Sequence, residues 1–344
     1  MAGSRVMVAM SGGVDSSVAA ALLVEAGHEV VGVTMKLWGG ASDTGCCSVS
    51  DVDDARWAAD ELGIEHHVFN FGAEFERHVV EPYVADHGAG RTPNPCIECN
   101  RHLKFDRLLG RAKVLGFDLI ATGHHARVVR RSGRPRLCRG VDQAKDQAYV
   151  LHVLDMAVLD RLLLPIGSMT KDEVRAKATD LGLRTAAKPD SQDVCFITAS
   201  AGRRGFLGER ISLRAGRVVD SAGATVGAVD AVEMVTIGQR KGLGLSGGAA
   251  PRYVVDVDTE AATVRVGDAD DLTSDFVPLE SWRWVDGPTQ ALVDVQTSAH
   301  GSTAPARIGS SRLEWLAPRR RVAPGQSVVA FLDDLVVGGG IAGR

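Results

Sequence analysis

Hydrophobic and polar positions along the first 125 residues alternate between two periods. Short runs rich in β-branched residues predict buried strands at residues 6–10, 29–35, 67–71 and 117–122. Between them, apolar residues recur at helical spacing and predict helices over residues 16–26, 51–62 and 100–115. Strands that alternate with helices favour a parallel sheet with helices on both faces, so the fold class predicted for this part is α/β.

The pattern changes further along the chain. Residues 126–131 and 136–139 flank a Ser-Gly pair and predict a β-hairpin, and helical patterns follow near residues 147–154 and 170–181. From about residue 210, short Val-rich runs are separated by Gly, Pro and Asp, which is typical of small antiparallel sheets or a barrel. We therefore expect the α/β part to end near residue 200 and β-rich structure to follow it.

Composition and length favour a multidomain globular protein. The 344 residues are 45% apolar and 24% charged, which excludes an intrinsically disordered chain. No run approaches 18 apolar residues, and the first apolar run leads into a glycine loop instead of a cleavage site, so we expect a cytoplasmic protein with no membrane partner. Six cysteines in so long a chain favour catalytic or metal-binding roles over a disulfide scaffold.

The net charge of -4 is distributed unevenly along the sequence. Residues 1–100 carry 5 basic and 15 acidic side chains, a net of -10, whereas residues 101–145 carry 12 basic and 3 acidic ones, a net of +9. The basic block includes Arg127, Arg130, Arg131, Arg134, Arg136 and Arg139. Charge alone leaves open whether this block is a solvated hairpin or a surface that neutralises phosphates.

The sequence SGGVDSS at residues 11–17 lies between a predicted strand and a predicted helix. Gly12 and Gly13 permit a tight turn with backbone N–H groups directed at an anion, and Ser16 and Ser17 open a helix whose positive end faces the same point. No lysine follows in the Walker frame. The segment therefore predicts a phosphate-binding loop of another type.

Two cysteines occur in segments suited to chemistry. In TPNPCIECN the prolines predict extended chain, and Asn100 is expected to cap the helix that follows. Cys99 would then stand just before a helix N-terminus, where the dipole and the nearby Arg101 and Lys104 lower the pKa of a thiol. The other is Cys195 in the loop-like segment KPDSQDVCFI.

These motifs together resemble the bacterial tRNA-specific 2-thiouridylase family of the PP-loop ATP pyrophosphatase superfamily. The resemblance covers almost the whole chain, in eight blocks: SGGVDSSVAA, GCCS with DARWAADELGI, TPNPCIECN with LKF, ATGHHAR, KDQAYVL, DSQDVCFI, TIGQRKGLGLSGG and PGQS. It implies a PP-loop ATP-binding and catalytic domain over residues 1–200, a small central β-rich domain over residues 201–272 and a C-terminal antiparallel β-barrel over residues 273–344.

The resemblance also implies the reaction, in which the wobble uridine of the tRNAs for Lys, Glu and Gln is adenylated and then sulfurated. ATP is expected to bind together with Mg²⁺, and the resemblance assigns ATP to Ala9, Met10, Ser11, Gly12, Gly13, Val14, Asp15, Ser16, Met35 and Gly123. It assigns tRNA contacts to His124, Lys145, Asp146, Gln147 and Gln326. Cys99 matches the nucleophile and Cys195 the persulfide carrier. The sulfur would come from a donor such as a cysteine desulfurase or relay protein, and turnover would leave a Cys99–Cys195 disulfide bond or release sulfide.

One position departs from the family pattern. Where better-known members carry an aspartate regarded as assisting the nucleophile, this chain has Cys96. Cys96, Cys99 and Cys195 would supply three thiolates, the set expected of a [4Fe-4S] cluster with one open position. Two further interpretations remain: a PP-loop ligase acting on a small amide acceptor, which leaves the cysteines and the basic block without a role, and an ATP sensor without turnover.

Overall fold

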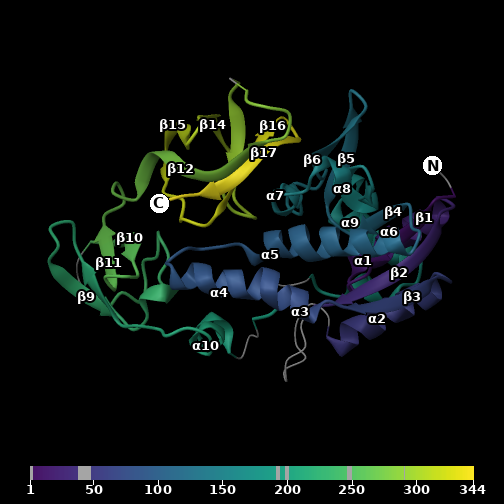
Figure 1. Cartoon of the computed structure of the whole chain (residues 1–344), viewed down its shortest axis with the longest axis horizontal. Helices are drawn as coiled ribbons and strands as arrows, with labels where there is room; N and C mark the ends of the chain where they lie inside the picture. Colours follow the sequence, from purple (N-terminus) through teal and green to yellow (C-terminus); the bar gives the residue numbers. More distant parts are fainter. Residues whose placement is uncertain (1–2, 38–47, 191–193, 198–200, 246–249, 290) are drawn as a thin grey trace. The chain divides into compact units, whose positions relative to one another are not determined.

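The computed structural model describes residues 3–37, 48–190, 194–197, 201–245, 250–289 and 291–344 (Figure 1). Cys46 and Cys47, within the GCCS block, lie outside these ranges. The chain forms two compact units. Unit 1 comprises Met1–Val80, Pro95–Ser200 and Asp334–Val336, and unit 2 comprises Glu81–Asn94, Ala201–Asp333 and Val337–Arg344. The domain limits at residues 200 and 272 stay predictions.

The core of unit 1 is a five-stranded parallel sheet, which confirms the predicted α/β class. Its strands are β1 (Arg5–Ala9), β2 (Glu29–Lys36), β3 (Glu65–Asn70), β4 (Leu119–Thr122) and β7 (Leu162–Leu163), in the order β3-β2-β1-β4-β7. The order reverses between β1 and β4, where Ala9 pairs with Thr122. In such sheets, ligands bind beyond the carboxyl ends of the strands at this reversal.

Helices α1 (Val14–Glu25) and α2 (Val49–Glu61) pack against one face of the sheet. Small residues of both helices, such as Ala20 and Ala58, pack with the fully buried Val6 and Val8 of β1, so the helix backbones approach the strands closely. The right-handed rule for parallel crossovers places the helices that connect β3 to β4 on the opposite face. That connection within unit 1 contains α3 (Gly72–Phe75), a π-helical turn (Glu76–Val80), α5 (Pro95–Glu98), a second π-helical stretch (Cys99–Arg107) and α6 (Leu108–Val114).

The helical segment that carries Cys99 begins earlier than the sequence pattern predicts. It starts at Pro95 and runs without a break to Val114, so the prediction of a start at residue 100 is wrong. Proline fits the first position of a helix because its φ is already helical and it has no N–H to leave unsatisfied. Asn100 is not a cap: it is buried, and its Nδ2 donates to the carbonyl of Val150 at 3.1 Å.

The rest of unit 1 follows the order expected from the sequence. Strands β5 (Ala126–Arg131) and β6 (Arg134–Arg139) form the predicted hairpin, whose turn residues Ser132 and Gly133 both have positive φ. The helix expected at 147–154 is only the four-residue α7 (Ala148–Leu151). Helix α8 (Met156–Leu159), a 3₁₀ turn (Pro165–Ser168), α9 (Lys171–Asp180) and a second 3₁₀ turn (Arg184–Ala187) complete the unit.

Unit 2 contains two β structures with separate apolar cores. The first is a four-stranded sheet in the order β10-β11-β8-β9, built from β8 (Gly216–Val219), β9 (Thr225–Val229), β10 (Tyr253–Asp258) and β11 (Thr263–Gly267). The unit also holds α4 (Glu81–Gly88), α10 (Gly202–Gly208) and a 3₁₀ turn (Val232–Met234).

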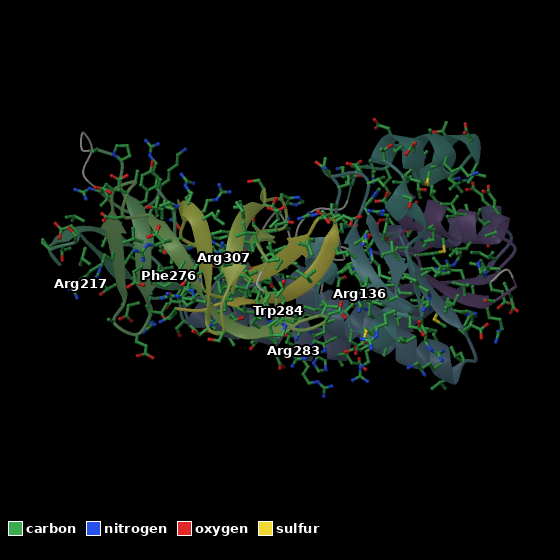
Figure 2. All side chains as sticks on the ribbon, turned by 90° about the horizontal axis from the view of Figure 1, so that it is seen from above. Arg136, Arg217, Phe276, Arg283, Trp284 and Arg307 are labelled. Atoms are coloured by element: carbon green, nitrogen blue, oxygen red, sulfur yellow. The ribbon has the colours of Figure 1, made fainter. Side chains whose placement is uncertain are left out.

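The second structure of unit 2 is the predicted antiparallel barrel. Six strands close because β12 pairs with both β15 and β17: β12 (Thr273–Trp284), β13 (Val293–Gln296), β14 (Ala304–Ile308), β15 (Arg312–Arg320), β16 (Ser327–Leu332) and β17 (Leu335–Ala342). On β12, Trp282 and Trp284 meet edge to face with ring centroids 5.3 Å apart; Trp284 and its neighbour Arg283 are labelled in Figure 2.

Candidate active site

The loop after β1 has the geometry of an anion cradle. Gly12 has φ +73°, and a Cβ at this position would lie 2.2 Å from the carbonyl oxygen of Asp51, so only glycine fits. Gly13 is the N-cap of α1 and has no side chain to accept from the first-turn N–H groups. The hydroxyls of Ser16 and Ser17 donate back to the carbonyl of Gly13, each at 3.0 Å. The first turn of α1 is therefore left to face an external anion.

The end of β4 closes against this loop. A Cβ on Gly123 would lie 2.5 Å from the carbonyl carbon of Asp15 and 2.6 Å from the nitrogen of Ser16. Met35, buried at the end of β2, lies at the same edge of the sheet. The ten residues that the resemblance assigns to ATP therefore come from β1 with its loop, β2 and the end of β4, but their contacts with a nucleotide stay a prediction.

We expect Gly123→Ala to lower the free energy of unfolding by about 1–3 kcal/mol, because the added methyl group overpacks the start of α1. The Michaelis constant for ATP should rise as well, since the loop must shift. Gly110→Ala in α6 is the matched control, because a Cβ there meets nothing within 4 Å. Chemical denaturation measures the difference, and equal stability of the two variants would contradict the close packing at Gly123.

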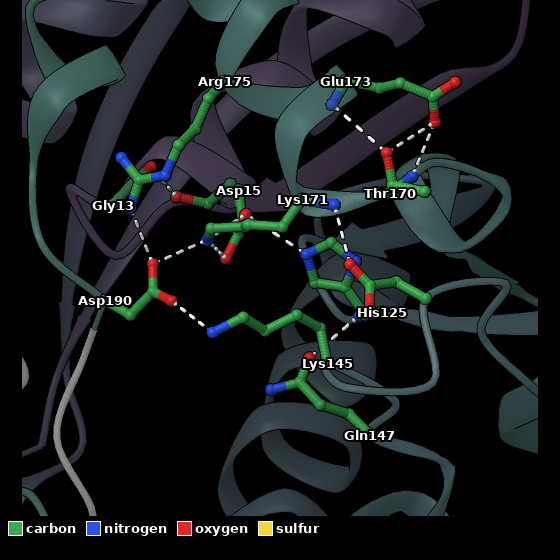
Figure 3. Close-up of polar contacts among 12 residues, drawn as sticks. Gly13, Asp15, His125, Lys145, Gln147, Thr170, Lys171, Glu173, Arg175 and Asp190 are labelled. Carbon is green, nitrogen blue, oxygen red and sulfur yellow. Dashed lines mark hydrogen bonds and ion pairs between the residues drawn. The ribbon is translucent and has the colours of Figure 1, made fainter.

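Polar and charged side chains that the sequence pattern did not single out converge on the loop. Nζ of Lys171 lies 2.8 Å from each carboxylate oxygen of Asp15, and Nε2 of His125 donates to the same carboxylate at 3.3 Å (Figure 3). Burial alone would raise the pKa of Asp15, but these hydrogen bonds outweigh it and hold the pKa below its usual value. Asp15 is thus ionised and paired at the mouth of the cradle.

Lys188 binds the loop from another direction. Its Nζ donates to the carbonyl of Gly12 at 3.0 Å and to Asp51 at 2.7 Å, and it also bonds Asp54. Burial lowers the pKa of Lys188, yet the two carboxylates raise it above its usual value, so the ammonium group is retained. Asp190, two residues on, accepts from Lys145 at 2.7 Å and from Lys171 and Arg175 at 2.9 Å each.

These residues had only a weak local signal. Lys171 follows Thr170, whose hydroxyl and Glu173 form a capping box that fixes the start of α9 and thereby the direction of the lysine. Lys188 and Asp190 stand in the block that carries Cys195, but nothing in their spacing shows which partner they reach. Lys171 and Asp15 are 156 residues apart in the sequence, and Lys188 and Asp51 are 137 residues apart. The contacts of Asp190 depend on how the loop after the second 3₁₀ turn folds back.

The four described cysteines are present as thiols. Cys99 is buried in the second turn of its helical segment, so the prediction that it stands just before the helix N-terminus is wrong. Cys96 occupies that first turn, three residues earlier and on the same side of the helix. Cys195 and Cys96 are half-buried. Cys138 is buried in β6, where burial raises the pKa of its thiol to about 11.

The structure places the residues predicted to contact tRNA in several environments. His124 is buried, and its Nδ1 is 2.7 Å from the hydroxyl of Thr122. Asp146 accepts from Arg139 and from backbone N–H groups, and the amide oxygen of Gln147 accepts from the backbone of His125 at 2.8 Å. Lys145 projects to Asp190. Gln326 lies in unit 2, where its amide donates to the carbonyl of Thr92.

The basic block is also partly neutralised. Arg127 pairs with Asp334, Arg130 with Asp160 at 2.6 Å and Arg139 with Asp146 at 2.7 Å. Arg136, which is labelled in Figure 2, is buried. Arg131 and Arg134 stand opposite each other in the strand register at the tip of the hairpin, and both are exposed, as is Arg130.

Comparison with known proteins decides the family. The model for a tRNA methyl transferase HUP domain matches residues 4–199, and the PRC-barrel domain model of the same group matches residues 204–268. The tRNA-specific 2-thiouridylase MnmA of Mycolicibacterium smegmatis is 46% identical over 96% of both chains. The chain belongs to the tRNA-specific 2-thiouridylase family.

Other relatives of the family agree. The tRNA-specific 2-thiouridylase MnmA of Beutenbergia cavernae is 47% identical over 97% of this chain and 93% of its own length. A crystal structure of a 4-thiouridine synthetase–RNA complex with bound ATP covers 56% of this chain and 45% of that chain at 20% identity, with a TM-score of 0.40.

The described residues of this 2-thiouridylase family member form neither a metal-binding group nor a membrane-spanning helix. Within the described part of the chain, no three His, Cys, Asp or Glu side chains are placed to hold one metal ion, and Cys96, Cys99 and Cys195 do not meet as cluster ligands there. Every helix in the described ranges is too short or too polar to cross a membrane.

Proposed function

We propose that this chain makes 2-thiouridine at the wobble position of the tRNAs for Lys, Glu and Gln, using ATP to activate the C2 oxygen. The observation that carries the proposal is the cradle of Gly12 and Gly13, faced by the N-terminus of α1 and bordered by Lys171 and Lys188. Backbone N–H groups and lysines around one loop are suited to hold a polyphosphate. The names of the curated relatives support the sulfur transfer and the tRNA substrate.

Activation precedes sulfur transfer because the uridine C2 oxygen is a poor leaving group. The oxygen attacks the α-phosphorus of ATP, so that pyrophosphate leaves and the oxygen carries AMP. Lys171 and Lys188 would stabilise the negative charge that builds up on the departing pyrophosphate. AMP then leaves with the former C2 oxygen when sulfur bonds to the carbon.

Sulfur is carried as a persulfide on Cys195, which is more exposed than Cys99 and so better placed to receive sulfur from a donor protein. In one route, the Cys99 thiolate attacks Sγ of Cys195, the inner sulfur of the persulfide. The Cys99–Cys195 disulfide forms, and the outer sulfur leaves as hydrosulfide, which attacks C2. In the other, the terminal sulfur attacks C2 first and Cys99 then attacks the Cys195 sulfur. Both routes end with a Cys99–Cys195 disulfide that an external thiol must reduce before the next turnover.

In the described structure, the three thiols are not placed to hold a cluster. Cys96 instead stands where an aspartate would suit the first helical turn. We expect Cys96→Asp to keep most of the activity and Cys96→Ala to lose at least about tenfold, because the first retains a group that can take a proton from Cys99. Anaerobic wild-type protein with about four irons per chain, and activity that follows its iron content, would contradict this.

The basic hairpin supplies a test of tRNA contact. Replacing Arg131 and Arg134 together by Ala should lower tRNA affinity and reduce the slope of log K against log salt by about 1.5, since each lost phosphate contact contributes about 0.7 to 0.9. Arg56→Ala removes an exposed arginine from the acidic part of the chain and is the control. Filter binding over a salt series measures the slopes, and identical slopes would show that the hairpin is only solvated.

The proposal as a whole is tested by incubating the protein with ATP, unmodified tRNA and a small-molecule persulfide. We expect pyrophosphate release that requires tRNA, together with thiolation of the wobble uridine. Pyrophosphate release with a small amide acceptor in place of tRNA would favour a different PP-loop ligase, and ATP binding without any turnover would favour a sensor.

A further inference from the structure

Asp190 is held by three cations around the phosphate cradle. Lys145 approaches one carboxylate oxygen at 2.7 Å, and Lys171 and Arg175 approach the other at 2.9 Å each (Figure 3). Lys171 bridges Asp190 to Asp15, the second residue of α1. Burial raises the pKa of Asp190, but Lys145 and Lys171 outweigh this and hold it well below its usual range, so Asp190 is an anion at neutral pH.

A carboxylate and a phosphate group use the same donors. Lysine ammonium and arginine guanidinium groups bind both through charge-assisted hydrogen bonds. A triphosphate that enters the cradle carries several negative charges, so Asp190 and the polyphosphate would repel each other and require the same cations.

The elements that carry the carboxylates decide which one moves. Asp15 lies on α1, and Asp51 and Asp54 lie on α2; both helices are packed on the central sheet. Asp190 lies beyond the last 3₁₀ turn of this region and belongs to no helix or strand. Of these four carboxylates, Asp190 can therefore move with the smallest loss of packing contacts.

Cys195 follows Asp190 by five residues. On its other side, Phe196 is buried and meets Phe75 edge to face, with ring centroids 5.6 Å apart. Val194 has φ +52°, a conformation that is strained for a β-branched residue. Phe196 is thus anchored by an apolar contact, and Asp190, five residues before Cys195 in the sequence, by ionic contacts at the cradle.

We propose that Asp190 is a displaceable counter-anion, which occupies Lys145, Lys171 and Arg175 until the polyphosphate of ATP replaces it and releases the turn at Cys195. The inference rests on the proposed function, because it needs ATP in this cradle. It makes Asp190 a positioning residue that couples nucleotide binding to the reactivity of the sulfur-carrying thiol. The sulfur-carrying thiol thereby becomes more reactive when the activating nucleotide is bound.

Nucleotide affinity gives the first test. We expect Asp190→Asn to bind Mg²⁺–α,β-methylene-ATP about tenfold more tightly than wild type, because the competing anion is lost and the competent state is always populated. Asp160→Asn, which removes the partner of Arg130 on the surface of the same unit, should leave affinity unchanged. If wild type binds no nucleotide, the proposed function fails; if it binds and Asp190→Asn binds equally, only the present inference fails.

Alkylation of Cys195 gives the second test and needs no variant. Site-resolved mass spectrometry after iodoacetamide treatment should show Cys195 reacting several-fold faster with Mg²⁺–α,β-methylene-ATP than without it, while buried Cys138 stays unreacted in both. In Asp190→Asn the rate should already be high and independent of nucleotide. A Cys195 rate that nucleotide leaves unchanged in wild type would overturn the coupling.

Discussion

Cys195→Ser is expected to abolish sulfur transfer while tRNA-dependent formation of AMP and pyrophosphate continues. A serine cannot carry a persulfide, so thiouridine formation should fall by at least about 10³-fold. Adenylation requires the cradle at the end of β1 and its lysines, none of which the substitution changes. Without sulfur, the adenylated uridine is lost only by hydrolysis to AMP and uridine. The first pyrophosphate per tRNA should therefore be released within about tenfold of the wild-type rate, and AMP should form more slowly.

Two assays on the same samples separate these steps. Pyrophosphate release is followed continuously, and thiouridine is quantified by mass spectrometry of digested tRNA. Cys138→Ser is the control, because that thiol is buried in β6 and has a raised pKa; it should keep both activities if the fold is kept. Equal loss of both activities in Cys195→Ser would count against separate sites for activation and sulfur transfer.

Lys171→Met is expected to reduce kcat/KM for ATP by about 10²–10³-fold, the loss typical when one donor to developing charge is removed. Lys171 is 8% exposed and provides the ammonium group that contacts both Asp15 and Asp190. Methionine keeps the length and apolar stem of the side chain but leaves two carboxylates facing each other without their shared cation. The affinity for tRNA should be unchanged.

Lys177→Met on the same helix is the matched control, because Lys177 pairs with Glu25 at the surface. Surface ion pairs contribute about 0–1 kcal/mol, so this variant should match wild type in both stability and ATP use. Steady-state pyrophosphate release over a range of ATP concentrations measures the effect. Normal ATP kinetics in Lys171→Met would remove the lysine from the polyphosphate site.

The sequence was sufficient where local pattern determines structure. The alternation of strands and helices predicted the parallel sheet. The two glycines predicted the tight turn after β1, where Gly12 has positive φ and Gly13 leaves the helix start without a side-chain cap, because both are local properties. The side chains that border the cradle were not predictable in the same way. Lys171 and Asp15 are 156 residues apart, and the sequence of neither indicates the other.

The start of the Cys99 helix shows a different limit. Two prolines in TPNPC suggest extended chain before Asn100, yet the second proline is the first residue of the helix, because proline is tolerated at that position as well as in extended segments. The chain after Pro95 must follow the π-helical path that buries Leu103 and Phe105, and this long-range packing selects the helix. As a result Cys96, and not Cys99, lies in the first turn of the helix, next to the positive end of the helix dipole.

The most direct measurement of the central claim follows the C2 oxygen of the wobble uridine. A synthetic tRNA carrying ¹⁸O at that single position is incubated with the protein, unlabelled ATP and a persulfide donor in unlabelled water. Because sulfur displaces AMP together with the activated oxygen, each thiouridine formed should be matched by one AMP that contains ¹⁸O. Thiouridine accompanied by unlabelled AMP would contradict adenylation of that oxygen.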